Sequence, residues 1–162
     1  MPPNPPADFY RPGAYGMDES VGYLIKRAMQ SIVTEADKRL LAHDLTHAQW
    51  MPLFKLWVGQ CSTSAMLARD LQLDPGATTR ALDRLEAKGL VRRLRSEQDR
   101  RVVNLELTDE GRKVAEVVPA VLAEVLNVHL AGFSHDEWQT LLVLLRKMIA
   151  NGDALKDTEE SP

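Results

Sequence analysis

Apolar residues recur at helical spacing over most of this chain. Between Glu19 and Leu41 they stand three or four positions apart and form one broad face, which predicts an amphipathic helix. A second helix is predicted to begin at Thr46, because Gln49 follows three residues later in the capping-box pattern. Pro52 lies inside this second helix and should bend it, since proline removes one backbone hydrogen bond.

Two shorter helices joined by a tight turn are predicted next. Ser62 or Thr63 can cap the first of them. The second is predicted to begin after Asp74, a favourable N-cap, with Pro75 in the first helical position, and to end at Gly89. A short helix, a tight turn and a second helix are typical of a helix-turn-helix.

The spacing then changes from helical to alternating. Val103, Leu105 and Leu107 stand two positions apart, which predicts a strand, and residues 91–95 form its plausible partner with residues 96–100 as the connecting tip. Because a two-stranded ribbon is only marginally stable by itself, we expect it to pack on the preceding helices.

The last part of the chain returns to helical spacing. Thr108 is predicted to cap a fifth helix that Pro119 bends. Ser134 and Glu137 form a second capping box, which opens a sixth helix that is expected to stop at Gly152. The predicted fold is therefore mainly α: four helices, a two-stranded β ribbon and two further helices.

Composition narrows the class of protein. The chain has 162 residues, of which 44% are apolar and 27% charged, as in an ordinary soluble globular protein. No apolar run approaches the ~18–20 residues of a membrane helix, and the first residues do not resemble a signal peptide. The single cysteine, Cys61, excludes an intrachain disulfide and indicates a reducing, cytoplasmic setting.

The distribution of charge is more informative than the net charge of −3. Residues 62–107 hold nine Lys or Arg and seven Asp or Glu, so this segment is net positive and the rest of the chain is negative. Five arginines fall within residues 92–101. Such a concentrated spot in a mildly acidic protein fits local recognition of an anion.

The helix predicted over residues 75–88 has two different faces. Thr78, Ala81, Leu82 and Leu85 gather on one side, and Gly76, Thr79, Arg80, Asp83, Arg84 and Ala87 gather on the other. A helix with small residues near its N-terminus and arginines behind them can enter a DNA major groove, where Arg80 could pair with a guanine and Thr79 reach a base or phosphate. A solvated helix face with ordinary charges is the alternative.

The arginine-rich ribbon supports the same interpretation. A hairpin tip with Arg95, Arg100 and Arg101 can enter a minor groove, and Asp99 could orient a neighbouring guanidinium there. The alternative is a charged β-turn without a ligand. A helix-turn-helix followed by a basic ribbon is a winged helix, and the combination is more specific than either half.

Residues 68–113 resemble the winged helix of the MarR family of bacterial transcriptional regulators. The resemblance lies in the two-helix block, the DRLEAKGLVRR segment, the D-x-R of the wing at Asp99 and Arg101, and the LTDEG that opens the next helix. It implies a homodimer joined by the first, fifth and sixth helices, with two recognition helices in successive major grooves of a pseudo-palindromic operator. It also implies that Arg101 reads the minor groove.

These arguments predict two sets of contact residues. The DNA-binding residues are Gly76, Thr78, Thr79, Arg80 and Arg84 on the recognition helix, and Arg95, Asp99, Arg100 and Arg101 on the wing. The dimer interface is predicted to contain Val21, Leu24, Val121, Val125, Leu141, Leu144, Leu145 and Met148, because the first, fifth and sixth helices carry more apolar surface than one small winged helix can cover.

The resemblance also implies an effector, since such regulators are often released from DNA by small phenols or aromatic carboxylates. Tyr23 and Arg27 on the first helix, with His47 and Trp50 on the second, are the predicted effector-binding residues. Plain core packing of Trp50 and a solvated Tyr23–Arg27 pair are the alternatives.

No catalytic residue, metal site or cofactor is predicted. His43 and His47 have a chelating spacing, but a predicted helix break lies between them, and Cys61 reads as a buried, inert thiol. The predicted function is a cytoplasmic repressor, not an enzyme, that an aromatic acid or phenol releases from genes of aromatic catabolism or efflux. A winged helix used for protein–protein contact, without an effector, is the alternative.

The predicted organisation is an extended, proline-rich arm over 1–17, a helical dimerisation region over 18–45 and 108–155, a winged helix-turn-helix over 46–107, and a frayed tail over 156–162.

Overall fold

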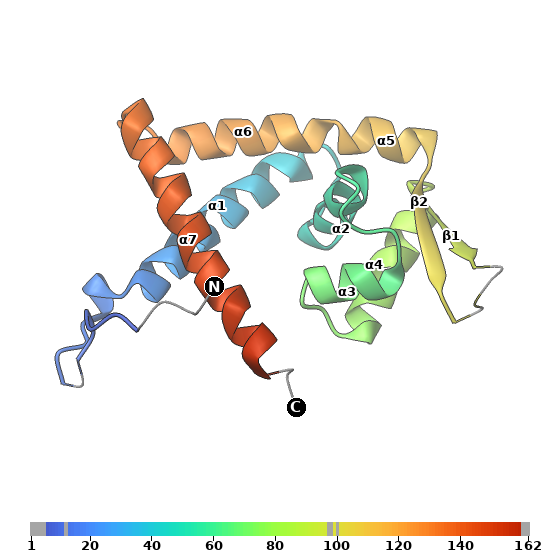
Figure 1. The fold of residues 1–162 in the computed structure, drawn as a ribbon. Coiled ribbons are helices and arrows are strands. Elements are labelled where there is room, and N and C mark those ends of the chain that lie inside the picture. The colour runs from blue at the N-terminus through green and yellow to red at the C-terminus, as the bar shows by residue number, and fades with distance from the viewer. Residues whose placement is uncertain (1–5, 12, 97–98, 100, 160–162) are drawn as a thin grey trace. The chain divides into compact units, whose positions relative to one another are not determined.

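The computed structural model of the protein describes residues 6–11, 13–96, 99 and 101–159. A short 3-10 helix (Met17–Glu19) comes first. The helices and strands labelled in Figure 1 follow it: α1 (Val21–Leu41), α2 (His47–Trp57), α3 (Ser64–Asp70), α4 (Pro75–Ala87), β1 (Val91–Arg95), β2 (Val103–Leu107), α5 (Asp109–Ala115), α6 (Val117–His129) and α7 (His135–Glu159). This order confirms a mainly α fold with a two-stranded wing. Within the described residues, no helix is both long and apolar enough to cross a membrane.

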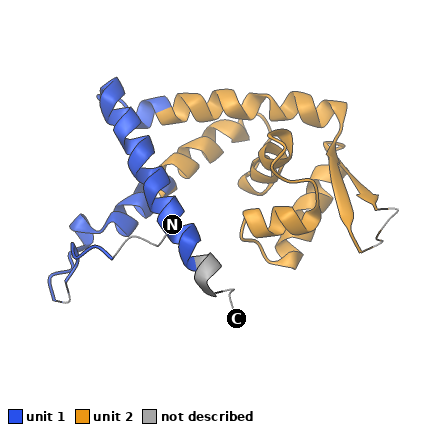
Figure 2. Cartoon of the chain, in the orientation of Figure 1, with its two compact units in different colours: residues 1–29, 127–162 blue, residues 30–126 orange. Residues whose placement is uncertain are grey.

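The chain divides into two compact units, shown in Figure 2. Unit 1 consists of residues 1–29 and 127–162, and unit 2 of residues 30–126. Unit 2 contains the whole predicted winged helix-turn-helix, together with the second half of α1, α5 and most of α6. Its core is formed by buried apolar side chains from these elements, including Leu40, Leu53, Leu67, Leu85, Val91, Leu105, Val118 and Val125.

Local capping signals fix where the helices of unit 2 begin. The side-chain oxygen of Gln49 accepts a hydrogen bond from the backbone N–H of Thr46 at 3.1 Å, as the capping box predicts. Thr63 Oγ1 accepts from the backbone N–H of Met66 at 3.2 Å at the start of α3. α2 and α3 therefore begin directly after the capping residues that the sequence predicted.

The wing is an antiparallel pair in which Val91 lies opposite Leu107 and Arg95 opposite Val103. Its base is tied to the start of α3, because the backbone N–H of Leu105 donates to the carbonyl of Ser62 at 2.9 Å. This contact confirms the expectation that the ribbon packs on the preceding helices.

The helix expected after the wing is divided in two. α5 ends at Ala115 and α6 begins at Val117, and Figure 1 shows the two helices end to end. Pro119 explains the interruption, since its ring has no N–H to donate to the carbonyl of Ala115 and clashes with it in a regular helix. The single helix predicted to bend at Pro119 is therefore two helices, α5 and α6.

The expected end of the last helix at Gly152 is wrong, because α7 runs on to Glu159. A glycine inside a helix costs only about 1 kcal/mol relative to alanine, and the good helix formers Ala150, Ala154 and Leu155 flank it. The predicted frayed tail is thus helical over 156–159, and residues 160–162 lie outside the described residues. The predicted capping box is present, since Ser134 N–H donates to Glu137 Oε2 at 2.7 Å.

The described part of the N-terminal arm forms no helix or strand before Met17. Its tyrosines instead contact the beginning of α1 within unit 1. The Tyr10 hydroxyl accepts from the backbone N–H of Val21 at 2.9 Å and donates to the carbonyl of Glu19 at 3.0 Å. The Tyr15 hydroxyl pairs with that of Ser20, which is itself buried. The arm thereby satisfies backbone groups that the first turn of a helix leaves unpaired.

Candidate nucleic-acid interface

α4 has the two faces that the sequence predicted. Asp74 caps the helix by accepting from Ala77 N–H at 2.8 Å, and Pro75 occupies the first helical position. The buried face consists of Thr78, Ala81, Leu82 and Leu85. The exposed face includes Gly76, Thr79, Arg80, Asp83 and Arg84.

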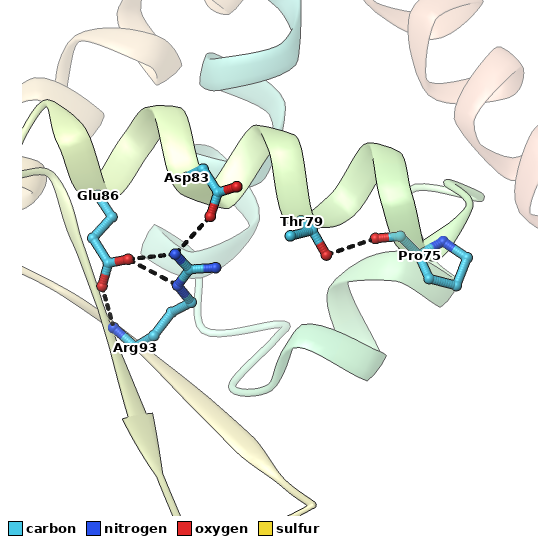
Figure 3. Close-up of polar contacts among 5 residues, drawn as sticks. All are labelled: Pro75, Thr79, Asp83, Glu86 and Arg93. Atoms are coloured by element: carbon cyan, nitrogen blue, oxygen red, sulfur yellow. Dashed lines mark hydrogen bonds and ion pairs between the residues drawn. The ribbon is translucent and has the colours of Figure 1, made fainter.

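Thr78 has to be removed from the predicted DNA contacts. Its side chain is only 4% exposed, and its hydroxyl donates to the carbonyl of Asp74 at 3.1 Å. The neighbouring Thr79 is exposed, and its hydroxyl donates to the carbonyl of Pro75 at 2.8 Å, as Figure 3 shows. Of these two threonines, Thr79 is therefore the one that can reach a ligand outside α4.

The absence of a side chain at Gly76 leaves room for Arg80. A Cβ at position 76 would lie 3.2 Å from Arg80 Nη1 and 3.1 Å from Asp74 Oδ1. The Arg80 guanidinium therefore lies beside the first turn of α4. This is the part of a recognition helix that meets base edges.

Several arginines of this region keep their positive charge available. Among the described residues, no ion pair involves Arg80, Arg84, Arg95 or Arg101, and all four side chains are exposed. Exposed guanidinium groups on both the helix and the wing are suited to binding phosphates and base edges.

Arg93, in contrast to these arginines, forms ion pairs with two carboxylates of α4, which Figure 3 draws. Its Nε donates to Glu86 Oε2 at 2.9 Å and its Nη2 donates to Asp83 Oδ1 at 2.6 Å. The hydrogen bonds from Arg93 hold the pKa of Glu86 below its ordinary value and in turn raise the pKa of Arg93. Sequence reasoning missed this cluster, although the spacing of Asp83 and Glu86 put two acids on one side of the helix.

At the wing tip, Asp99 accepts two hydrogen bonds from backbone N–H groups. Its Oδ1 accepts from the backbone N–H of Arg101 at 2.9 Å, and its carbonyl accepts from Val102 N–H at 2.9 Å. These bonds order the backbone that presents Arg101, and the predicted pairing of the Asp99 carboxylate with a neighbouring guanidinium stays a prediction. Arg100, also predicted as a contact, lies outside the described residues.

The four residues predicted to bind an effector belong to both units. Tyr23 and Arg27 are in unit 1, where the guanidinium carbon of Arg27 lies 5.9 Å from the centre of the Tyr23 ring. His47 and Trp50 are in unit 2, and both contact Asp37 Oδ1, at 3.0 and 2.6 Å. Trp50 is only 3% exposed, so it belongs to the core and its assignment as an effector contact is corrected.

Unit 2 has an apolar cavity that the sequence did not indicate. It measures about 160 Å³ and lies between α2, the turn after α3, and α4. Its lining is His47, Ala48, Met51, Pro52, Leu71, Leu73, Ala77 and Ala81. Sequence patterns could not reveal it because its walls come from segments that only the tertiary fold brings together.

The predicted interface residues differ in exposure. Val21, Leu24, Leu144 and Met148 are exposed, and Leu141 and Leu145 are half-buried. Val121 and Val125 are 8% and 0% exposed because they pack in the core of unit 2. The assignment of Val125 to a dimer interface is therefore wrong, since a fully buried side chain has no surface to offer a partner. Val121 also lines a surface pocket with Arg39 and Val117, so its assignment stays a prediction.

Cys61 is buried, as predicted, with its sulfur 3.5 Å from Asp70 Oδ2. Burial, followed by the neighbouring Asp70 carboxylate, raises the pKa of the Cys61 thiol above its ordinary value. A thiol in this state is a poor nucleophile.

A helix-turn-helix followed by a two-stranded wing, with exposed arginines on both, defines a winged-helix DNA-binding protein. Comparison with known proteins assigns the family. The MarR family profile matches residues 45–103, and the chain is 34% identical to the multiple antibiotic resistance protein MarR of Escherichia coli over 130 residues, which are 80% of this chain and 90% of that protein. The chain belongs to the MarR family and is a DNA-binding transcriptional regulator, not an enzyme.

Solved structures agree with this assignment. A crystal structure of apo MarR from E. coli matches with a TM-score of 0.72 and 32% identity, covering 80% of this chain and 96% of that one. The S. aureus MepR–DNA complex matches with a TM-score of 0.70 and 26% identity, covering 81% and 97%. A mutant E. coli MarR complexed with operator DNA matches with a TM-score of 0.69 and 32% identity, covering 79% and 92%.

Proposed function

We propose that the protein is a homodimeric, cytoplasmic repressor that a small aromatic acid or phenol releases from a pseudo-palindromic operator. One observation carries the proposal: α4 presents Arg80 and Arg84 on its outer face, while Ala77 and Ala81 of the same helix line the apolar cavity. A ligand in that cavity would press on the back of the helix that reads DNA.

The DNA contacts follow from the exposed side chains. α4 enters a major groove, where Arg80 can pair bidentately with a guanine and Thr79 can reach a base or phosphate. The wing places Arg95 and Arg101 in the adjacent minor groove, where A·T-rich sequence concentrates negative potential. Two copies of the chain would read half-sites about 34–36 Å apart, one turn of DNA.

Exposed apolar side chains of unit 1 support the dimer. α1 presents Val21, Leu24, Ile25 and Met29 to solvent, and α7 presents Val143, Leu144, Met148, Ile149 and Leu155. Exposed apolar side chains in this number are typical of protein–protein interfaces. Because these side chains have no other cover within the described residues, a second copy of the chain is the partner we infer.

The cavity suits a single aromatic ring. Its volume of about 160 Å³ is close to that of engineered apolar cavities that bind benzene, ~150 Å³. His47 is the polar side chain among its lining residues, and it replaces Arg27 as the proposed partner for a carboxylate or phenol oxygen. Such a ligand lowers operator affinity only if it binds the DNA-free conformation more tightly.

Ligand titration tests this function. Benzoate, salicylate and phenol would be added to the complex of the protein with a duplex that it selects from a random-sequence pool. We expect at least one of them to weaken binding by ~5–150-fold, the usual range of allosteric coupling. Ala48→Leu should fill the cavity and abolish the response, and Ala123→Leu, at an exposed position of α6, is the matched control. Failure of all three compounds at millimolar concentration would contradict the proposed effector.

A further inference from the structure

We propose that Arg93 is a positioning residue that holds α4 and the wing at one fixed angle, so that both reach DNA together. Asp83, Glu86 and Arg93 are called the clamp below. The proposal rests on the proposed DNA contacts of Arg80 and Arg101, one on each of the elements that the clamp joins.

The clamp connects residues from two different elements. Asp83 and Glu86 are three positions apart on α4 and therefore project to the same side of the helix. Arg93 comes from the middle of β1, and its guanidinium binds both carboxylates (Figure 3). The contacts run directly from the recognition helix to the first strand of the wing.

The geometry of the clamp constrains orientation as well as distance. One oxygen of Glu86 accepts from Nε and Nη2 of Arg93, while its other oxygen accepts from the backbone N–H of Arg93 at 3.3 Å. The Arg93 side chain is 29% exposed, so solvent competes with these bonds only in part. The planar fork of arginine makes several such bonds at once, and the ammonium group of lysine cannot reproduce them.

The clamp also lies between the two proposed DNA readers along the chain. β1 continues from Arg93 to Arg95, and the turn after it presents Arg101 through the bond between the Arg101 N–H and Asp99. A two-stranded ribbon has little stability of its own, so its direction depends on what its base is attached to. Fixing that direction before binding removes part of the entropy cost of making the second DNA contact.

Removing the charge of Glu86 separates the clamp from a simple charge effect, because the two predict opposite changes in DNA affinity. Glu86 is an acid near a surface that binds a polyanion, so charge alone predicts that Glu86→Gln tightens DNA binding. The clamp predicts weaker binding, because a neutral amide holds the guanidinium less firmly than a carboxylate. Glu106→Gln, at an exposed position of β2 opposite Arg92, removes the same charge without touching the clamp.

We would measure affinity for the selected duplex by titration, with thermal unfolding as the check on folding. Glu86→Gln is expected to weaken binding about tenfold, through the lost advantage of two linked contacts, whereas Glu106→Gln should leave it unchanged or tighter. Hydroxyl-radical footprinting, which reports on sugars lining the minor groove, should show lost protection where the wing enters. Methylation protection at guanine N7 in the major groove should be retained. Glu86→Gln binding that equals or exceeds that of the wild type overturns the proposal.

Arg93→Lys provides a second test that keeps every charge, and it decides the matter if Glu86→Gln does not fold. It should weaken binding as Glu86→Gln does, while Arg92→Lys, on the opposite face of β1, should not. In the wild type, the effects of Arg80→Ala and Arg101→Ala should be coupled, and in Arg93→Lys they should become additive. If neither alanine variant weakens binding at all, the proposed DNA contacts fail. If both do but the clamp variants bind normally, only the clamp fails.

Discussion

Gly111 lies directly against the backbone carbonyl of Leu90. A Cβ built on Gly111 would stand 1.9 Å from the Leu90 oxygen, far inside van der Waals contact. The same oxygen accepts from the backbone N–H of Thr108 at 3.1 Å. The first turn of α5 is thus seated on the residue that precedes β1, and this close approach requires glycine.

Gly111→Ala should therefore destabilise the protein. Overpacking of this kind costs about 1–3 kcal/mol, which exceeds the gain of about 1 kcal/mol from the better helix propensity of alanine. Gly22→Ala is the matched control, since nothing lies within 4 Å of its added Cβ and it stands inside α1. Denaturant unfolding should show a loss for Gly111→Ala and a small gain for Gly22→Ala. Equal stability of Gly111→Ala and the wild type would mean that the contact is absent in solution.

Arg80→Ala and Arg101→Ala should weaken DNA binding in different ways. Loss of a bidentate base contact at Arg80 is expected to cost about 1–3 kcal/mol and to relax specificity at one base position. Loss of Arg101 should weaken binding most where the flanks are A·T-rich, because the narrow minor groove there attracts arginine. Gel-shift titrations on duplexes with altered flanks separate the two effects, with Arg146→Ala on α7 as a control. Unchanged affinity in both variants would rule out these two residues as DNA readers.

Leu144→Asp should convert the protein from dimer to monomer. Leu144 is 58% exposed, so an aspartate there leaves unit 1 intact but places an unpaired charge in the proposed interface, at a cost of several kcal/mol. Sedimentation should give about twice 18.1 kDa for the wild type and 18.1 kDa for the variant. Gln139→Asp, at an exposed polar position of the same helix, should remain dimeric. A monomeric wild type at micromolar concentration would refute the interface.

The Glu137 carboxylate should stabilise unit 1 near neutral pH and lose this effect in acid. Its carboxylate accepts from the backbone N–H of Ser134, which lowers the pKa of Glu137 below its ordinary value. A carboxyl with a lowered pKa in the folded state stabilises the fold above its unfolded pKa, and this stability is lost as the pH falls through the folded value. Melting temperatures measured from pH 7 down to pH 3 should fall less steeply for Glu137→Gln than for the wild type. Identical slopes would show that the cap contributes nothing.

Capping residues and apolar spacing were sufficient to predict most of the fold. Thr46, Asp74 and Ser134 mark helix starts through local hydrogen bonds. The side chains of Asp74 and Ser134 accept from backbone N–H groups three residues later, and the backbone N–H of Thr46 donates to the Gln49 side chain. The outer face of α4 and the turn of the wing could be predicted for the same reason, as they depend on local geometry. The predicted helix end at Gly152 is wrong because a glycine can either end a helix or lie inside it.

Contacts between distant elements were out of reach of sequence patterns. The pairing of Arg93 with Asp83 and Glu86 requires β1 to lie beside α4. Val125 has the same periodicity as an interface residue, and only the packing of unit 2 shows that it belongs to the core. The prediction of Thr78 as a DNA contact conflicts with its position on the apolar stripe of α4, and its burial shows that the stripe is the better guide.

The fluorescence of the Trp50 indole reports on unit 2, which contains the winged helix. Trp50 is 3% exposed and bonded to Asp37, whereas Trp57 is 39% exposed and Trp138 belongs to unit 1. Replacement of Trp57 and Trp138 by phenylalanine leaves one tryptophan, in the core of unit 2, which can be excited at wavelengths that tyrosine does not absorb. Its emission should shift to longer wavelength when that core opens to water, so the melting of unit 2 can be recorded separately from that of unit 1.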